Sequence, residues 1–337
     1  MTLGARRCLR LAFGVAVAAA VAYGKGWPMG YLVVVLTATL LIVPMPPPGV
    51  KPTLMLLVLT LLTCGWGLLL GPVLTYVPVA GVLLMMIGIA GASALATRPA
   101  TAVVASLVIL GNTIVAVVAA QSSAAAVALV LLLVLAVVVG VIIAHIAHAL
   151  FPEDGAMAPP APPVLPPGTA QWVGLRSALI MLPPMLLALN NPASYIMLLM
   201  KGAQLSQQVQ ATATRDMARE LVLSTAVGGG AAMLIWWLLG LWPVLPVLAL
   251  LFALLALALA RPLYGVVATR HRFSFWQNAV VTMIIIIGPA VEDSANGTDI
   301  QRQMLTRIAT FMALALYAAV MVHTLDAARA RKRVVDA

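Results

Sequence analysis

A polar run interrupts an otherwise apolar chain between residues 204 and 220. It reads QLSQQVQATATRDMARE, so amides and hydroxyls precede two arginines and two acids. Amide and guanidinium groups donate hydrogen bonds that suit a carboxylate. The alternative is a cytoplasmic connecting segment, which is polar only because water surrounds it. On the first interpretation, the candidate substrate-binding residues of this run are Gln204, Gln207, Gln208, Arg215 and Arg219.

Lys201 lies just before this run, inside the apolar stretch YIMLLMKGAQL. A lysine at membrane depth is costly unless its ammonium group extends to the membrane surface or faces water. Two interpretations follow. The side chain either extends to the inner surface or faces a substrate path, and in the second case Lys201 joins the substrate-binding set.

Two histidines and one acid are candidates for proton coupling. Histidine titrates near neutral pH, and His145 and His323 end corresponding apolar runs in the two halves of the chain. Glu220 is the candidate intramembrane acid. Because both histidines fall at predicted inner helix ends, the alternative is a pair of interfacial side chains without any coupling role.

Charged groups of both signs meet near the start of the last apolar run. Arg302 and Arg307 follow Glu292 and Asp293 closely in the sequence. An ion-pair cap at the outer end of the last helix is one interpretation. A basic exit vestibule for an anion is the other.

Motifs of soluble enzymes are missing from the sequence. It contains no GxxxxGK[ST] phosphate loop, no GxSxG elbow and no HExxH pair. The two cysteines, Cys8 and Cys64, fall within or beside apolar runs, which disfavours a disulfide framework or a cysteine-based metal site. We therefore expect neither an enzyme nor a bound metal or other cofactor.

Composition explains how these residues must be held. Of the 337 residues, 63% are hydrophobic and 8% charged, whereas a soluble domain carries about 25% charged residues. Twelve spans of about 20 residues would use about 240 residues. The chain is therefore predicted to be an all-α integral membrane protein, a polytopic bundle of 10–12 transmembrane helices in contact with membrane lipid. The net charge of +10 is dispersed over short loops, which disfavours nucleic-acid binding.

The sequence also contains an internal repeat. LRLAFG, ending at Gly14, resembles LRSALI, ending at Ile180, and WPMGY, ending at Tyr31, resembles NPASY, ending at Tyr195. Further weak matches follow in the same order. We therefore expect two six-helix repeats. The predicted divisions are a first repeat at 1–150, a Pro-rich cytoplasmic linker at 151–171, a second repeat at 172–327 and a basic cytoplasmic tail at 328–337.

The predicted helices of the two repeats correspond in order. They cover 8–24, 28–44, 52–71, 75–96, 101–120 and 124–149 in the first repeat, and 173–190, 192–206, 217–240, 243–260, 274–291 and 303–326 in the second. The second helix of each repeat is too short to span a membrane comfortably. Paired short segments of this kind are a pointer to a transport site.

Lysine and arginine positions predict the orientation. If the N-terminus is cytoplasmic, the outer loops contain only Lys25 among the basic residues, and both termini lie inside. An even number of helices in each half then makes the repeats parallel. Ten spans would also keep both ends inside, although five-helix repeats would be inverted.

The first repeat resembles the fusaric acid resistance and aromatic acid exporter family. The shared pattern is LRLAFG, a short helix opened by GWP, a Pro-rich break and a Gly-rich third helix. In the second repeat, Arg219 followed by Ser224, Thr225 and Gly228 resembles the arginine, Gly-Thr and glycine pattern of that family. The first repeat departs from the pattern. Longer relatives carry a cytoplasmic domain where this chain has only the linker, so the chain resembles a short branch of the family.

The resemblance implies a secondary efflux transporter of small organic, mainly aromatic, acids in the bacterial inner membrane. It also implies a periplasmic membrane-fusion protein as a partner, and the sequence leaves room for a homo-oligomer. Two alternatives stay open. One is a non-transporting membrane scaffold or assembly protein, and the other is a transporter of a different twelve-helix class, such as the major facilitator type.

Overall fold

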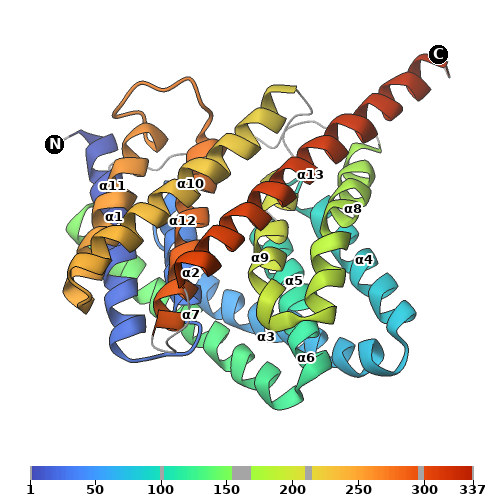
Figure 1. Cartoon of the computed structure of the whole chain (residues 1–337), viewed down its shortest axis with the longest axis horizontal. Helices are drawn as coiled ribbons and strands as arrows, with labels where there is room; N and C mark the ends of the chain where they lie inside the picture. Colours follow the sequence, from blue (N-terminus) through green and yellow to red (C-terminus); the bar gives the residue numbers. More distant parts are fainter. Residues whose placement is uncertain (1, 99–101, 154–167, 209–214, 295–299, 336–337) are drawn as a thin grey trace. The chain divides into compact units, whose positions relative to one another are not determined.

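The computed structural model describes residues 2–98, 102–153, 168–208, 215–294 and 300–335, and all of its regular elements in these ranges are helices (Figure 1). The elements of the first half are α1 (Leu3–Gly24), α2 (Tyr31–Ile42), α3 (Val50–Tyr76), α4 (Pro78–Leu95), α5 (Ala102–Leu110), the π-helical turn η2 (Gly111–Val115), α6 (Ala116–Gln121) and α7 (Ser123–Leu150). Those of the second half are α8 (Thr169–Asn190), α9 (Pro192–Gln208), α10 (Arg215–Leu241), α11 (Leu245–Leu263), α12 (Phe273–Ser294) and α13 (Ile300–Val335).

Each of the twelve helices predicted from the sequence is present, with ends that differ by a few residues. The helix predicted at 101–120 is continuous in direction but contains the π-helical turn η2. The last helix is longer than predicted and continues to Val335. Most of the predicted linker, residues 154–167, lies outside the described residues.

In the described part of the chain, ten helices are long and apolar enough to cross a membrane. They include a single span, Val104–Gln121, built from α5, η2 and α6. Several of them expose large apolar side chains, as α3 does with Leu62 and Leu69. Such surfaces are typical of contact with lipid. The chain is therefore a polytopic helical membrane bundle, as the sequence predicts.

The short helix α2 ends because of its flanking residues. After Ile42, Val43 is extended, with ψ of 126°. The residue before a proline avoids the helical region, and Pro44 is followed by three more prolines within the next four positions. The hydroxyl of Tyr264 donates to the carbonyl oxygens of Leu41 and Ile42 at 3.0 and 2.9 Å. These hydrogen bonds satisfy carbonyl groups that have no partner within the helix.

The corresponding short helix α9 begins at a proline, which is favoured at the first helical position. The side-chain oxygen of Asn191 accepts a hydrogen bond from the backbone N–H of Ser194 at 3.2 Å and caps the helix. The helix ends at Gln208, shortly before residues 209–214, which lie outside the described part of the chain.

Helix contacts divide the chain into two compact units. Unit 1 comprises residues 1–57, 133–159 and 223–309. In it, α1 packs against α2 and α11, and α12 packs against α2 and α11. Figure 1 shows α1 running beside α11.

Unit 2 comprises residues 58–132, 160–222 and 310–337. In it, α8 packs against α4 and α9, while α5 and η2 also contact α9.

The close approach of α3 to η2 in this unit depends on a glycine. A Cβ added at Gly67 of α3 would stand only 2.1 Å from the carbonyl oxygen of Gly111, so no larger residue fits there. Each compact unit takes helices from both halves of the sequence.

Candidate anion-binding site

The side chain of Lys201 is fully buried within unit 2. It belongs to α9, and its ammonium nitrogen Nζ donates to Oε1 of Gln204, one helical turn further on, at 3.4 Å. Lys201 therefore does not extend to the surface of the unit. The amide of Gln204 is therefore a direct neighbour of this buried basic group.

The amide of Gln204 is oriented by this contact. Because Oε1 accepts from Lys201, the NH2 group of the amide points elsewhere. Its nitrogen Nε2 is buried and has no hydrogen-bond partner among the residues that the structure describes. A buried donor without an acceptor costs about 1–3 kcal/mol. The site therefore presents a cation and a donor that lacks an acceptor, one turn apart on the same helix.

Helix α8 covers this region of α9. Gly202 makes the close approach feasible, because a Cβ at this position would lie 2.9 Å from the sulfur of Met181 and 3.1 Å from Pro184. The hydroxyl of Ser177 on α8 donates to the backbone oxygen of Ser206 at 3.2 Å, and both serines are buried. Polar groups thus continue along the α8–α9 contact within unit 2.

The other residues of the predicted polar run are less well defined. The side chains of Gln207, Gln208 and Arg215 lie outside the described part of the structure. Arg219 lies on α10 and is exposed. Among the predicted substrate-binding residues whose side chains are described, Lys201 and Gln204 lie together and Arg219 does not join them.

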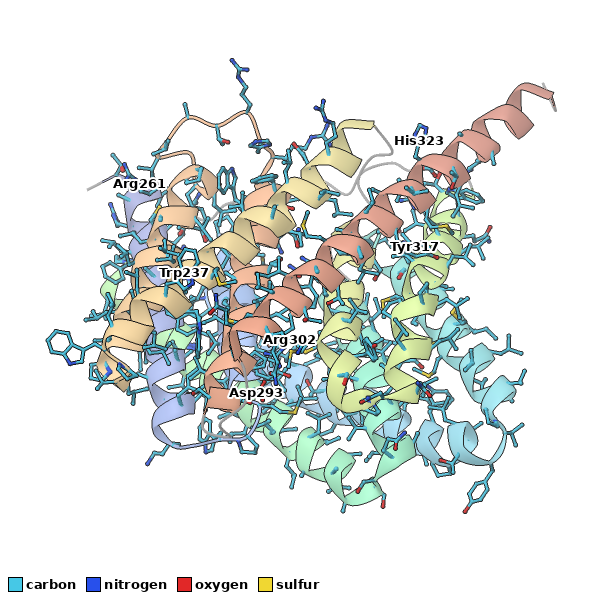
Figure 2. All side chains as sticks on the ribbon, in the orientation of Figure 1. Trp237, Arg261, Asp293, Arg302, Tyr317 and His323 are labelled. Atoms are coloured by element: carbon cyan, nitrogen blue, oxygen red, sulfur yellow. The ribbon has the colours of Figure 1, made fainter. Side chains whose placement is uncertain are left out.

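The candidate proton-coupling residues lie on three helices. His145 of α7 is exposed and its Nδ1 lies 2.8 Å from the backbone oxygen of Val141. His323 is exposed on α13, where Figure 2 labels it. Glu220 is half-buried near the start of α10. Their role in proton coupling stays a prediction.

Two buried asparagines were not singled out from the sequence. In unit 2, Asn112 of η2 accepts a hydrogen bond from the indole of Trp66 at 3.2 Å and donates to the backbone oxygen of Met85 at 2.8 Å. In unit 1, Asn278 of α12 donates to the hydroxyl of Ser224 at 2.6 Å. Both asparagines are fully buried.

A signal for these asparagines does exist in the sequence. The segments NTIV, from Asn112, and NAVV, from Asn278, lie 166 residues apart, close to the repeat offset. An amide inside an apolar run must find a partner within the protein. Applying that criterion at corresponding positions of the two predicted repeats would have found both residues.

Each unit also contains a buried arginine paired with an acid. In unit 1, the fully buried Arg10 donates to Glu153 at 2.6 Å, and Arg7 pairs with the same carboxylate. In unit 2, Arg176 donates to Asp326 at 2.6 Å, and the indole of Trp172 donates to the other carboxylate oxygen at 2.7 Å.

Burial alone would raise the pKa of Glu153. The hydrogen bonds and positive charges of Arg7 and Arg10 outweigh that effect and lower the pKa below its ordinary value of 4.5. The carboxylate therefore stays ionised at neutral pH and holds α1 to the end of α7.

The ion pair at the start of the last helix is present. Arg307 of α13 donates to Asp293 of α12 at 2.6 Å, which agrees with the interpretation of an ion-pair cap for these two residues. Figure 2 labels Asp293 and, on the first turn of α13, Arg302. No group of three or more His, Cys, Asp or Glu side chains that could hold a metal ion occurs in the described ranges.

Comparisons with known proteins give one match. Searches of curated proteins and of solved structures gave no match. Residues 7–147 match the model of a family described as "Protein of unknown function (DUF2955)". The match extends from the second turn of α1 to the last turn of α7.

Proposed function

We propose that the chain is a secondary transporter that exports small organic, mainly aromatic, acids across the bacterial inner membrane. The observation that carries the proposal is the buried pair of Lys201 and Gln204, in which the amide Nε2 has no acceptor. A carboxylate supplies hydrogen-bond acceptors for this amide donor, and its negative charge suits the basic side chain of Lys201. A neutral substrate supplies no charge, and a cation would be repelled.

The chemistry of such a site follows from its low polarity. An ion pair is much stronger in a buried site than in water, but bringing the ions there costs desolvation energy. A carboxylate attached to an apolar ring loses less hydration than a small inorganic anion, and its ring gains from burial. This balance favours organic acids over chloride or phosphate. Arg215 and Arg219 would attract the acid toward the site, and Gln207 and Gln208 would donate hydrogen bonds to it.

A tandem repeat fits this proposal. The family match over residues 7–147 covers nearly the same stretch as the predicted first repeat. The packing of α1 against α2 and α11 in unit 1 has a counterpart in the packing of α8 against α9 and α4 in unit 2. At the repeat offset of 164, Thr37 corresponds to Lys201. Only one of the two corresponding positions carries a charge, so we propose one anion site in the chain.

The short helices bear on the proposed topology. With 12 residues, α2 is about 18 Å long, less than the ~30 Å of a bilayer core. Each half then has five crossings, from the ten long helices. An odd number turns the second half upside down, so the repeats would be inverted and not parallel. Both termini would still be cytoplasmic, and a periplasmic membrane-fusion protein would receive the exported acid.

Binding of radiolabelled benzoate to the purified protein tests the proposal. We expect Lys201→Met to weaken binding at least tenfold, because the ammonium group supplies the charge, and Gln204→Leu to weaken it less. The control for net charge is Arg98→Gln, which removes a positive charge three residues after the end of α4. Equal benzoate binding by the wild type and Lys201→Met would overturn the residue assignment, and no binding by the wild type would favour the scaffold alternative.

A further inference from the structure

A second cluster of buried polar groups lies in unit 1, where α1, α2 and α12 meet. The hydroxyl oxygens of Tyr23 and Tyr31 and the Oε1 atom of Glu292 are all buried, and within the described residues none of the three has a hydrogen-bond partner. Tyr31 as a whole is 1% exposed. Three polar atoms without partners in one region are uncommon in a folded protein.

The absence of a side chain at Gly288 lets α12 approach Tyr23 and Tyr31 closely. A Cβ at Gly288 would lie 2.2 Å from the Cβ of Tyr31 and 3.0 Å from the hydroxyl of Tyr23. Glu292 follows Gly288 by four residues and therefore lies on the same face of α12. The charge on Glu292 acts on both phenols, which places all three groups within electrostatic reach of one another.

The carboxyl group of Glu292 also contacts the beginning of α2. The backbone N–H groups of Met29, Gly30 and Tyr31 hydrogen-bond to it. These N–H groups have no acceptor within the helix, and the residue at the cap position, Gly30, has no side chain to supply one. An ionised Glu292 would also interact favourably with the N-terminal end of the helix dipole.

Two other charged groups of the described residues near the cluster, Asp293 and Arg307, pair with each other. Asp293, the next residue of α12, accepts a hydrogen bond from Arg307 of α13 at 2.6 Å. The guanidinium group of Arg307 therefore compensates Asp293. The ionised form of Glu292 is therefore stabilised by the N-terminus of α2.

We propose that Glu292, Tyr23 and Tyr31 form a buried proton-binding site. A proton from solution bonds to a carboxylate oxygen of Glu292, and the carboxyl group so formed turns toward a phenol oxygen and donates a hydrogen bond to it. No other bond breaks. Protonation removes the negative charge that faces the N–H groups of Met29 to Tyr31 and weakens the cap of α2. This short helix therefore responds to the protonation of Glu292.

The site differs from the predicted proton-coupling residues, since none of His145, His323 and Glu220 belongs to it. It also stands independently of the transported compound, because Lys201 belongs to unit 2 and Glu292 to unit 1. If the chain exports acids, the site gives the proton a place to bind. If it does not, the proton still binds.

Infrared spectroscopy of the full chain in lipid films, titrated from acidic to alkaline pH, tests this proposal. We expect a carboxyl C=O band in the wild type that disappears as Glu292 loses its proton and is absent from Glu292→Gln. The control Glu220→Gln retains the band, and so does Lys201→Met. Identical titrations of the wild type and Glu292→Gln would overturn the proposal.

The tyrosine variants keep the proposal testable if Glu292→Gln does not fold. Tyr31→Phe and Tyr23→Phe retain the carboxyl group but remove a phenol oxygen. Because the protonated carboxyl then loses its acceptor, we expect the band to shift and the proton affinity to fall about tenfold, or about one pH unit in the midpoint. A band of unchanged position and midpoint in both variants would contradict the proposed site.

Discussion

Replacing Glu153 by glutamine tests the buried charge pairing of unit 1. The substitution removes the acid that pairs with both Arg7 and Arg10, and Arg10 is fully buried. Removing one partner of a buried ion pair costs about 3–5 kcal/mol, since the remaining charge is left in a medium of low polarity. Arg7, whose side chain is 16% exposed, can regain contact with water, so the cost comes mainly from Arg10.

The corresponding change in unit 2 provides a graded comparison. Asp326 is 19% exposed in its side chain, against 7% for Glu153. We therefore expect Asp326→Asn to cost less, about 1–3 kcal/mol. Lys25→Gln removes an exposed charge and should change the stability by less than about 0.5 kcal/mol.

The assay is unfolding of the purified protein in mixed micelles, followed by circular dichroism, with the free energy of unfolding taken from the midpoint and slope. Adding Arg10→Met to Glu153→Gln should recover part of the loss, because no unpaired charge is then buried at position 10. A free energy of unfolding for Glu153→Gln within about 0.5 kcal/mol of the wild type would refute the reasoning.

Three further predictions use the same assay. Because the pKa of Glu153 is lowered in the folded protein, its contribution to stability is present above pH 4.5 and is lost as the pH falls through the folded-state pKa, so acidification should destabilise the wild type more than Glu153→Gln. Gly67→Ala should lower the free energy of unfolding by about 1–3 kcal/mol, since the new Cβ meets a carbonyl oxygen at 2.1 Å. The control Gly65→Ala, whose Cβ would have nothing within 4 Å, should not lower it. Equal losses in the two variants would contradict the packing of α3 against η2. Asn278→Leu should cost about 1–3 kcal/mol, because the amide that bonds to Ser224 is lost inside the membrane, and a stability equal to the wild type would show that this hydrogen bond has no net value.

The helices were predictable because the signals that define them are local. Long apolar runs separated by proline, glycine and charged residues give helices of membrane length, and Pro44 and the prolines after it explain why α2 is short. The π-helical turn at Gly111 was not predicted, since an apolar run with a single asparagine looks like an ordinary helix.

The packing partners were not predictable in the same way. The sequence predicts two repeats but does not indicate which helices pack together, and each compact unit contains helices from both halves. The shapes of the side chains decide which helix faces pack together. Many helices of this chain are apolar on all sides, so their sequences do not mark one face for packing. The pairing of Arg10 with Glu153 was also missed, because 143 residues separate them.

The candidate anion site was partly visible in the sequence. A lysine in an apolar run is unusual enough to single out Lys201, and Gln204 follows at helical spacing. From the sequence, Glu292 was considered only as part of an ion-pair cap or an exit vestibule, since Tyr23 and Tyr31 come from distant segments. Comparing corresponding positions of the two predicted repeats, such as Thr37 and Lys201, shows from the sequence that only the second repeat carries a charge at this position.

The most direct test of the central claim is the accumulation of labelled benzoate in cells that express the wild type, Lys201→Met or no protein. Our account predicts lower accumulation only with the wild type, and only while the proton gradient is maintained. Equal accumulation in all three strains, with the proteins present in the membrane, would contradict the export of aromatic acids by this chain.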